Sequence, residues 1–473
     1  MQWATEWGIF ASLGGLWALI SLVKNPQPIL IQRFNSLCMF IIGGLLTWKS
    51  FSSFSAPDIT LWFDIALFSL ALASLWAIHP FADAQTFSLV AWSLTGVALV
   101  THGQTCLRLF VGLELQVLPL YILCVRHQPA YGIRSALHYF MLNALSSCLI
   151  GMGYVFYVLH SGIIDLGELT FLQALAPHSV LFILGGCLLK IGLIPFHFWV
   201  PKVLHRHQWI MLGMVGTLGK LTVLKALVWT GLHDLWLVVT FGLCAMTMMW
   251  GVLCAWVEDD LCRLFAFSGL AQSGWMVAAL WTMEPHLAGF YCSLYGLSLW
   301  GVIAYALHTP NTCLKISHWQ GWIRKDPYAF GVLTLCLLSL AGLPPLGGMF
   351  PKFFLLVQWA YTSNFIMMIG GALAALGSVA YTLRLIGTML APSTSSLLPA
   401  LARARHIQIA IFGVLLPLVL GWSYAFSQHC SHNNGNGNGK NHNQCASRHA
   451  THQNEEQNSQ RVQPNAVTNP NRR

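Results

Sequence analysis

The sequence is poor in charged residues. Only 8% of its 473 residues are Asp, Glu, Lys or Arg, whereas 56% are hydrophobic, and the mean hydropathy is +0.62. In a soluble protein about 25% of the residues are charged. So few charges cannot cover a surface that faces water, which excludes a soluble globular protein. The composition predicts an all-α membrane protein that crosses the bilayer many times.

The sequence also lacks the patterns that hold metals and redox cofactors. Its 13 cysteines are scattered, with no Cys-x-x-Cys pair and no short Cys/His spacing in the apolar part. This argues against iron–sulfur, haem and zinc sites there. We therefore expect the chain to bind no metal ion and no cofactor of its own.

Apolar runs of about 20 residues, each long enough to cross a bilayer, recur with short polar breaks between them. They predict about fourteen transmembrane helices, at 5–23, 33–52, 60–79, 84–101, 105–125, 134–159, 179–200, 209–231, 235–257, 262–283, 286–308, 327–362, 364–389 and 406–427. Span seven contains proline, in IPFHFW, and span twelve contains proline and glycine, in GLPPLGG. These residues predict discontinuous helices, because proline removes a helical hydrogen bond.

The basic residues fall mainly in the odd-numbered loops between these spans. They are Lys24, Arg33, Arg126, Arg134, Lys202, Arg206, Arg263, Lys315, Arg324, Lys325, Arg403 and Arg405. The positive-inside rule then places the odd loops in the cytoplasm, or its organellar equivalent, and both termini on the other side. After Ser427 the sequence becomes rich in Asn, Gln, His and Gly. We therefore predict a membrane domain at 1–427 and a disordered polar tail at 428–473.

A few ionisable residues fall inside the predicted spans: Glu114, Lys190, Lys220, Lys225 and Lys352. A charge at the centre of a bilayer costs at least ~2.5–3.5 kcal/mol, so such residues point to a function. A glutamate beside a lysine favours the charged form of both groups, and separating them releases the proton of the lysine. Buried lysines linked by water can therefore act as a proton relay. The alternative is a set of permanent structural ion pairs.

Two blocks of five spans carry a lysine beside a broken helix in their fourth span. Lys190 precedes IPFHFW in spans four to eight, and Lys352 follows GLPPLGGMFP in spans nine to thirteen. Because each block has an odd number of spans, the second copy is inverted in the membrane. Inverted repeats with broken helices mark ion-handling sites in transporters. The pattern predicts two such repeats, at about 84–231 and 235–389.

Several stretches carry a resemblance to a known family, in that family's order and spacing over about 100–390. They are LFVGLELQVLPLY, ALHYFMLNALSSCLIGMGYVFY, LLKIGLIPFHFWVPKV, LGKLTVLKALVW, DDLCRLFAFSGLAQSGW and SLAGLPPLGGMFPKFFLL. In these stretches the chain resembles the N subunit of bacterial NADH:quinone oxidoreductase (respiratory complex I), which corresponds to subunit 2 of the mitochondrial and plastid enzymes. That family is also similar to subunits of Mrp-type cation/proton antiporters.

The resemblance implies a role for each buried charge. Glu114 matches the glutamate that pairs with the lysine of span seven, which is Lys190 here. Lys220 matches the span-eight lysine that passes protons toward the centre. Lys352 matches the span-twelve lysine that hands protons to the far side, a position where the sister M subunit has glutamate.

Further positions are less fully matched to the family. His138, His197 and Lys225 are candidates for additional members of the relay. The histidine that the family has on span ten is Gln272 here, so water is expected to replace one titratable link.

The function that the resemblance implies is that of a proton-translocating membrane subunit of the respiratory chain. Electron transfer in partner subunits, which bind NADH, FMN, iron–sulfur clusters and quinone, is expected to drive proton pumping through this chain. Its expected partners are the other membrane subunits of the complex and lipid, without nucleic acid, in a bacterial or organellar inner membrane. Two alternatives stay open: a subunit of an Mrp-type Na⁺/H⁺ antiporter or membrane-bound hydrogenase, and a non-pumping structural scaffold.

Overall fold

The structure is a computed structural model of the chain. It describes residues 59–424 except 79–82, 104, 128, 162–176, 205–208, 229–233, 283–284, 309–314 and 393–408. The chain divides into two units, Met1–Gly421 and Trp422–Arg473. The helices and sites considered below belong to the first unit, and the second is described only at 422–424. The predicted spans at 5–23 and 33–52 and the predicted tail at 428–473 lie outside the described residues.

The described part of the chain is helical and contains no strand beyond one isolated bridge between Asp260 and Lys315. Its long helices are α3 (Ile59–Ile78), α4 (Ala84–Thr101), α5 (Cys106–His127), α6 (Pro129–Ser161), α11 (Asp234–Val257), α12 (Leu261–Leu280), α13 (His286–Ala306) and α17 (Phe365–Leu390). Seven stretches of the described residues are long and apolar enough to cross a membrane. The predicted class, an all-α membrane protein, is confirmed, while the number of fourteen spans stays a prediction.

Two further spans are interrupted where proline and glycine predicted a break. Span seven consists of α7 (Pro177–Ile191), a 3₁₀ turn η2 (Phe196–Trp199) and the short α8 (Val200–Val203). Span twelve consists of α15 (Pro327–Ala341) and α16 (Met349–Tyr361). A short connection before α15 contains η4 (Ile316–Trp319) and α14 (Trp322–Lys325). The discontinuous helices of spans seven and twelve are therefore present in the structure.

The two interruptions share one backbone geometry. α7 is followed by Gly192 and α15 by Gly342, with φ of +81° and +86°, a conformation that glycine adopts without strain. Each glycine N–H donates to the carbonyl oxygen four residues earlier, at 3.0 Å in both helices. A cis-proline follows three residues after each glycine, at Pro195 and Pro345. Both half-helices thus end in a left-handed glycine cap, which turns the chain away from the helix axis.

The cap at Gly342 predicts a measurable loss of stability. In Gly342→Ala the new Cβ would lie 2.8 Å from Cδ of Lys352, and the residue would keep a positive φ. We expect a loss of about 1–2 kcal/mol, the cost of left-handed backbone for a residue with a side chain. Thermal unfolding of the purified protein measures this loss. Gly331→Ala on α15 is the control, because a Cβ added there would meet no atom within 4 Å apart from its own helix backbone. Equal losses in the two variants would contradict this explanation.

Span eight is also irregular, which the sequence did not predict. It consists of α9 (Trp209–Gly213), a π-helical turn η3 (Met214–Leu218) and α10 (Gly219–Val228). In the π turn, the hydroxyl of Thr217 donates to the carbonyl of Gly213 at 2.6 Å and accepts from the indole N–H of Trp300 at 3.2 Å. Such turns are rare and occur often at functional sites. This one directly precedes Lys220.

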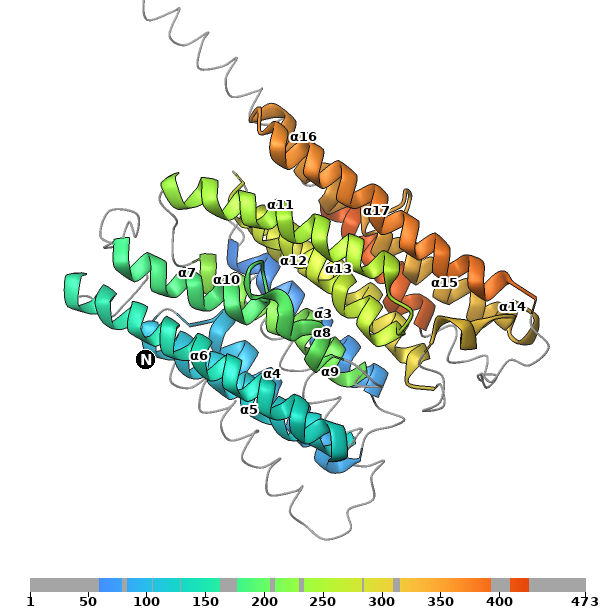
Figure 1. Cartoon of the computed structure of the whole chain (residues 1–473), viewed down its shortest axis with the longest axis horizontal. Coiled ribbons are helices and arrows are strands. Elements are labelled where there is room, and N and C mark those ends of the chain that lie inside the picture. The colour runs from blue at the N-terminus through green and yellow to red at the C-terminus, as the bar shows by residue number, and fades with distance from the viewer. Residues whose placement is uncertain are drawn as a thin grey trace, which may run out of the picture. The chain divides into compact units, whose positions relative to one another are not determined.

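Helix α10 lies in the interior of the first unit. It packs against α4, α7, α12 and α13, while α13 also packs on α3 and α15, and α11 packs on α12 and α17 (Figure 1). Every residue of α13 is buried. In α10 the residues from Lys220 to Leu227 are all buried. Large apolar side chains are instead exposed on α5, α6, α11 and α17. The two lysines of α10 therefore lie among packed helices rather than at the apolar surface.

Candidate functional site

Glu114 and Lys190 form an ion pair inside the helix bundle. Nζ of Lys190 lies 3.4 Å from Oε1 of Glu114 and 3.3 Å from the hydroxyl oxygen of Ser147. The hydroxyl of Ser147 also donates to the same oxygen of Glu114. Lys190 is buried, whereas the side chain of Glu114 is 33% exposed. The structure thus brings together the predicted pair, and it adds Ser147, which the sequence did not single out.

The local fold explains why Lys190 lies beside Glu114. It occupies the last turn of α7, directly before the glycine cap at Gly192. Positive charge is favoured at the carboxyl end of a helix, where carbonyl groups lack intrahelical partners. The indole N–H of Trp199, beyond the break, donates to the carbonyl of Leu189 at 3.0 Å and fixes the two parts of span seven together.

Lys220 lies on α10, on the side that faces α12. Its Nζ donates to the carbonyl oxygen of Gly269 at 2.5 Å and lies 5.1 Å from the centre of the Tyr295 ring. Both of these partners are neutral, and the lysine is only 5% exposed. A carbonyl group and an aromatic face both favour a nearby ammonium group. Neither prevents the lysine from giving up its proton.

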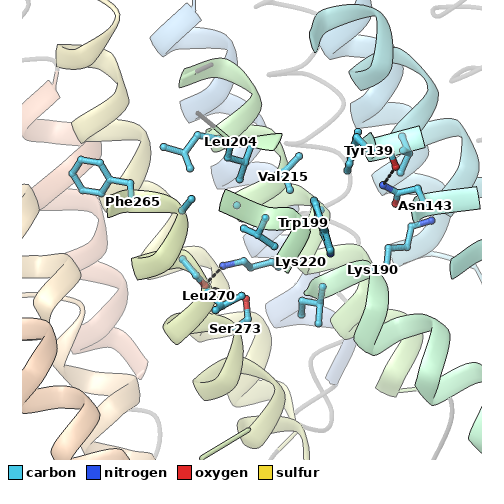
Figure 2. A pocket seen from close by; sticks show the side chains of 18 of the residues that line it. Tyr139, Asn143, Lys190, Trp199, Leu204, Val215, Lys220, Phe265, Leu270 and Ser273 are labelled. Carbon is cyan, nitrogen blue, oxygen red and sulfur yellow. Dashed lines mark hydrogen bonds between the residues drawn. The ribbon is translucent and has the colours of Figure 1, made fainter. Parts of the chain in front are cut away.

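A cavity of about 30 Å³ extends between Lys190 and Lys220. Its polar lining includes the side chains of Gln116, Tyr139, Asn143, Ser273 and Tyr295. Figure 2 shows Lys220 directed toward α12 and Lys190 on the opposite side of the cavity, near Asn143. A polar cavity of this size has room for about two water molecules. Such waters would connect the two lysines.

Gln116 of α5 is a polar group of this cavity that the sequence analysis missed. It is 1% exposed, and its Oε1 accepts a hydrogen bond of 2.7 Å from the hydroxyl of Thr222 on α10. Among the described residues its Nε2 has no hydrogen-bond partner. A buried amide N–H without a protein partner is a natural donor to a cavity water. A glutamine two residues after Glu114, within an apolar helix, was the signal in the sequence.

Lys352 lies in the first turn of α16, just beyond the break of span twelve. Its Nζ donates to the carbonyl oxygens of Ala341 at 2.8 Å and Leu340 at 3.4 Å, and to the hydroxyl of Ser378 on α17 at 3.4 Å. Ala341 ends α15, so these carbonyls lack helical partners. Lys352 therefore caps the first half of its own broken span, and it is buried there.

Gln272 lies on α12 within hydrogen-bonding reach of the same half-helix end. Its Nε2 donates to the carbonyl oxygen of Leu340 at 3.5 Å, and its Oε1 accepts from the hydroxyl of Tyr291 at 2.5 Å. The amide is 1% exposed. Gln272 and Lys352 thus share one carbonyl acceptor, Leu340. The water link expected beside Gln272 stays a prediction.

The two histidines considered from the sequence lie elsewhere. His138 is exposed on α6, where its Nδ1 lies 2.8 Å from the carbonyl oxygen of Arg134 on the same helix. His197 is half-buried in η2, with its ring 5.8 Å from the ring of Trp250. Neither belongs to the lining of the cavity between Lys190 and Lys220. The geometry leaves both histidines apart from the lysines.

Lys225 is fully buried on α10, but it faces α3 rather than α12. Its Nζ lies 5.0 Å from the centre of the Phe63 ring, and the carboxylate of Asp64 interacts with it electrostatically. It does not line the cavity beside Lys220.

The basic residues near helix ends make ordinary ion pairs. Arg384 of α17 donates to the carboxylate of Asp259 at 2.5 Å and to the carbonyls of Trp256 and Glu258. Arg126 pairs with Asp83 at 2.8 Å. In the described ranges, no group of three or more His, Cys, Asp or Glu side chains is arranged to hold a metal ion.

Comparisons with known proteins agree with this architecture. The family model described as "NADH:quinone oxidoreductase/Mrp antiporter, TM" matches residues 104–377. The chain is 28% identical to NADH-quinone oxidoreductase subunit N of Flavobacterium psychrophilum over 417 residues, which cover 83% of this chain and 89% of that protein. The predicted resemblance to the N subunit is thereby confirmed.

Two solved structures share the fold. A chain of respiratory complex I from Thermus thermophilus matches with a TM-score of 0.77 and 24% identity, over 88% of this chain and 96% of that one. A chain of the Mrp complex from Dietzia sp. matches with a TM-score of 0.70 and 14% identity, over 88% and 93% of the two chains. The chain is an integral membrane protein that belongs to the family of NADH:quinone oxidoreductase and Mrp antiporter membrane subunits.

Proposed function

We propose that this chain is a proton-translocating membrane subunit of NADH:quinone oxidoreductase. Protons pass through it from Lys190 to Lys220 and then to Lys352. One observation carries the proposal: the lysines at 190, 220 and 352 are buried, and a polar cavity extends between the first two. A membrane protein retains buried ionisable groups of this kind chiefly for transport.

The Glu114–Lys190 ion pair controls when the relay transfers a proton. At a separation near 4 Å, two unit charges attract each other by about 4 kcal/mol at an effective dielectric constant of 20. A movement or a proton that weakens the 3.4 Å contact therefore changes the proton affinity of Lys190. Electron transfer in partner subunits supplies the signal that opens and closes this pair.

The next step transfers the proton through the cavity to Lys220. Gln116, Asn143 and Ser273 hold the water that bridges the two amines. The flexible stem of a lysine lets its amine move between partners. The carbonyl of Gly269 keeps Lys220 directed toward α12, the helix that also carries Gln272.

The last step runs along α12 to Lys352. Gly269 and Gln272 are three residues apart, which places them on adjacent positions of one helix face. Gln272 and Lys352 meet at the carbonyl of Leu340. An amide does not titrate in this range, so Gln272 orients neighbouring groups while water or a tyrosine hydroxyl carries the proton.

The proposed topology follows from the matching breaks. The glycine caps at Gly192 and Gly342 support two inverted repeats, at about 84–231 and 235–389, within a membrane domain at 1–427. The positive-inside rule places both termini on the non-cytoplasmic side. NADH, FMN, iron–sulfur clusters and quinone are bound by the partner subunits, and this chain contributes only the proton path.

A test of the assembly separates this function from that of an antiporter subunit. Purification of the complex with its partners intact is expected to yield flavin and iron–sulfur cofactors together with this chain. Their spectra and the partner peptides are measured in the same preparation. A stable complex without either cofactor, but with Na⁺/H⁺ exchange in vesicles, would favour the Mrp-type alternative.

Gln116 provides a further test of the cavity. In Gln116→Leu the amide that holds a cavity water is lost, and proton transfer through this subunit should slow about tenfold, since one hydrogen bond contributes about 1.4 kcal/mol to the barrier. Proton uptake during turnover of reconstituted complex measures the effect. Gln358→Leu on α16 is the control, because that side chain is outside the cavity lining. Equal rates in the two variants would exclude a role for Gln116.

A further inference from the structure

We propose that Asp64, His102 and Lys225 form a second proton-exchange site, which connects Lys220 with the aqueous phase at one end of the helix bundle. The three residues come from α3, from the end of α4 and from α10, and we refer to them as the α3–α4–α10 cluster. The inference rests on the proposed function, because it needs Lys220 to carry protons.

The cluster combines three kinds of titratable side chain in one small region. Lys225 is 0% exposed and lies over the ring of Phe63, with Nζ 5.0 Å from the ring centre. Asp64, the neighbour of Phe63, is 6% exposed and interacts electrostatically with Lys225. Nδ1 of His102 lies 3.9 Å from Oδ1 of Asp64. The amine of Lys225, the carboxylate of Asp64 and the imidazole of His102 therefore follow one another in space.

Lys225 and Lys220 are neighbours on one helix but face different partners. Five residues of α-helix correspond to about 7.5 Å along the axis and to a rotation of about 140°. Lys220 accordingly contacts α12, at Gly269, while Lys225 contacts α3, at Phe63. A lysine stem of four methylene groups and one water can bridge a gap of this size. The proton on Lys220 thus has two possible directions.

The cluster lies near the end of the bundle that carries few basic residues. His102 directly follows α4, and its side chain is 18% exposed. The opposite end of α4 begins after Asp83, which pairs with Arg126. In the proposed topology the arginine-containing end is cytoplasmic, so His102 lies toward the other side. His286, at the start of α13, is a further buried titratable group at this end, on a helix that packs against α3.

The exposures of the cluster increase from the interior to the surface. They are 0% for Lys225 and 6% for Asp64, and 18% for the side chain of His102. A purely structural ion pair would need only one acid and one base. The additional imidazole at the wet end supplies a group that exchanges protons with water near neutral pH.

The transfer balances in three steps. The ammonium group of Lys225 gives its proton to the carboxylate of Asp64, which leaves a neutral amine and a carboxylic acid. Asp64 then gives the proton to the nitrogen of His102 that faces it, and the imidazolium releases it to water. Lys225 is protonated again from Lys220, so that one proton leaves for each proton that Lys220 passes to Lys225.

The test uses the assembled complex in vesicles, with protons released per electron as the readout. Asp64→Asn and Lys225→Met are measured singly and together, with the amount of assembled complex determined for each. We expect all three variants to lose the part of proton release that passes through the cluster. A structural ion pair behaves differently, because replacing both charged partners by neutral residues is often harmless to stability. Recovery of proton release in the double variant would therefore overturn the inference.

Two controls make the outcome unambiguous. Ser69→Ala on α3 removes another buried polar group, one that bonds only to its own helix at Ala66, and should pump normally. Lys220→Met tests the proposed function itself. If Lys220→Met loses pumping while the double variant of the cluster pumps normally, only the second site is excluded. If the single variants fail to assemble, the test rests on proton release by the double variant. That variant removes both charges of the pair and so leaves no buried charge without its partner.

Discussion

A complex that carries Lys190→Met is expected to lose most of the proton transfer through this subunit. The amine is the group that joins the Glu114 pair to the cavity, at 3.4 Å from the carboxylate and in the cavity lining. A positioned proton donor contributes about 10²-fold or more to a rate. We therefore expect a decrease of about 10²-fold in the rate of proton transfer. The pH change outside reconstituted vesicles during NADH oxidation measures it.

A variant of Glu114, the ion-pair partner of Lys190, tests the same prediction. Glu114→Gln removes the charge that Lys190 faces, and it should also lower pumping, because the lysine then lacks the counter-charge that controls its proton. Lys202→Met is a suitable control, since Lys202 is exposed at the end of the same span, beside Phe198. Normal pumping in an assembled complex that carries both Lys190→Met and Glu114→Gln would end the relay hypothesis.

Replacement of Lys352 by methionine is expected to block the release of protons by way of Lys352, again by about 10²-fold or more. Lys352 caps α15 through Leu340 and Ala341, and it shares the Leu340 carbonyl with the Gln272 amide. Without the amine of Lys352, this path lacks its last proton donor. Single-turnover measurements with a pH dye on each side of the membrane would show fewer protons released than taken up.

The cap formed by Lys352 also has a stability role, which needs a separate control. Ser378→Ala removes one of the neutral acceptors of Nζ while leaving the amine in place. It should lower stability slightly, by about 0.5–1.5 kcal/mol, and leave pumping intact. If Ser378→Ala stops pumping as fully as Lys352→Met, the effect belongs to the packing of the break rather than to the proton on Lys352.

Local features of the fold could be predicted from the sequence because they depend on neighbouring residues. The breaks of spans seven and twelve follow from glycine and proline, whose backbone preferences act within a few residues. Buried lysines are visible because charge inside an apolar run is costly. The pairing of Glu114 with Lys190 came from the family resemblance, and the structure places the two at 3.4 Å.

Features that depend on which helix faces meet could not be predicted. Ser147 of α6 and Gln116 of α5 are ordinary polar residues within apolar helices until packing against α5 and α10 brings Glu114 and Thr222 to them. The sequence also does not reveal that His138 is exposed, because the outward face of α6 is as apolar as its inward face. In a membrane, apolar periodicity does not distinguish lipid-facing from protein-facing sides.

The site around Gln272 shows the same limit in another form. From the sequence, a glutamine in place of histidine meant only that water was expected to replace one titratable link. In the fold, its amide joins Tyr291 to the carbonyl of Leu340, next to Lys352. Whether a polar residue interrupts or connects a path depends on hydrogen bonds from residues distant in sequence, which no local pattern encodes.

The central claim is that the buried lysines change protonation while the complex works. ¹⁵N NMR of complex labelled at lysine Nζ tests it directly, with Lys190→Met and Lys220→Met assigning the signals. The relay predicts Lys190- and Lys220-dependent signals that change between amine and ammonium in the range from about pH 5 to about pH 10, where ordinary surface lysines remain charged until the upper end. Signals that remain those of ammonium throughout would contradict the relay and favour the structural scaffold.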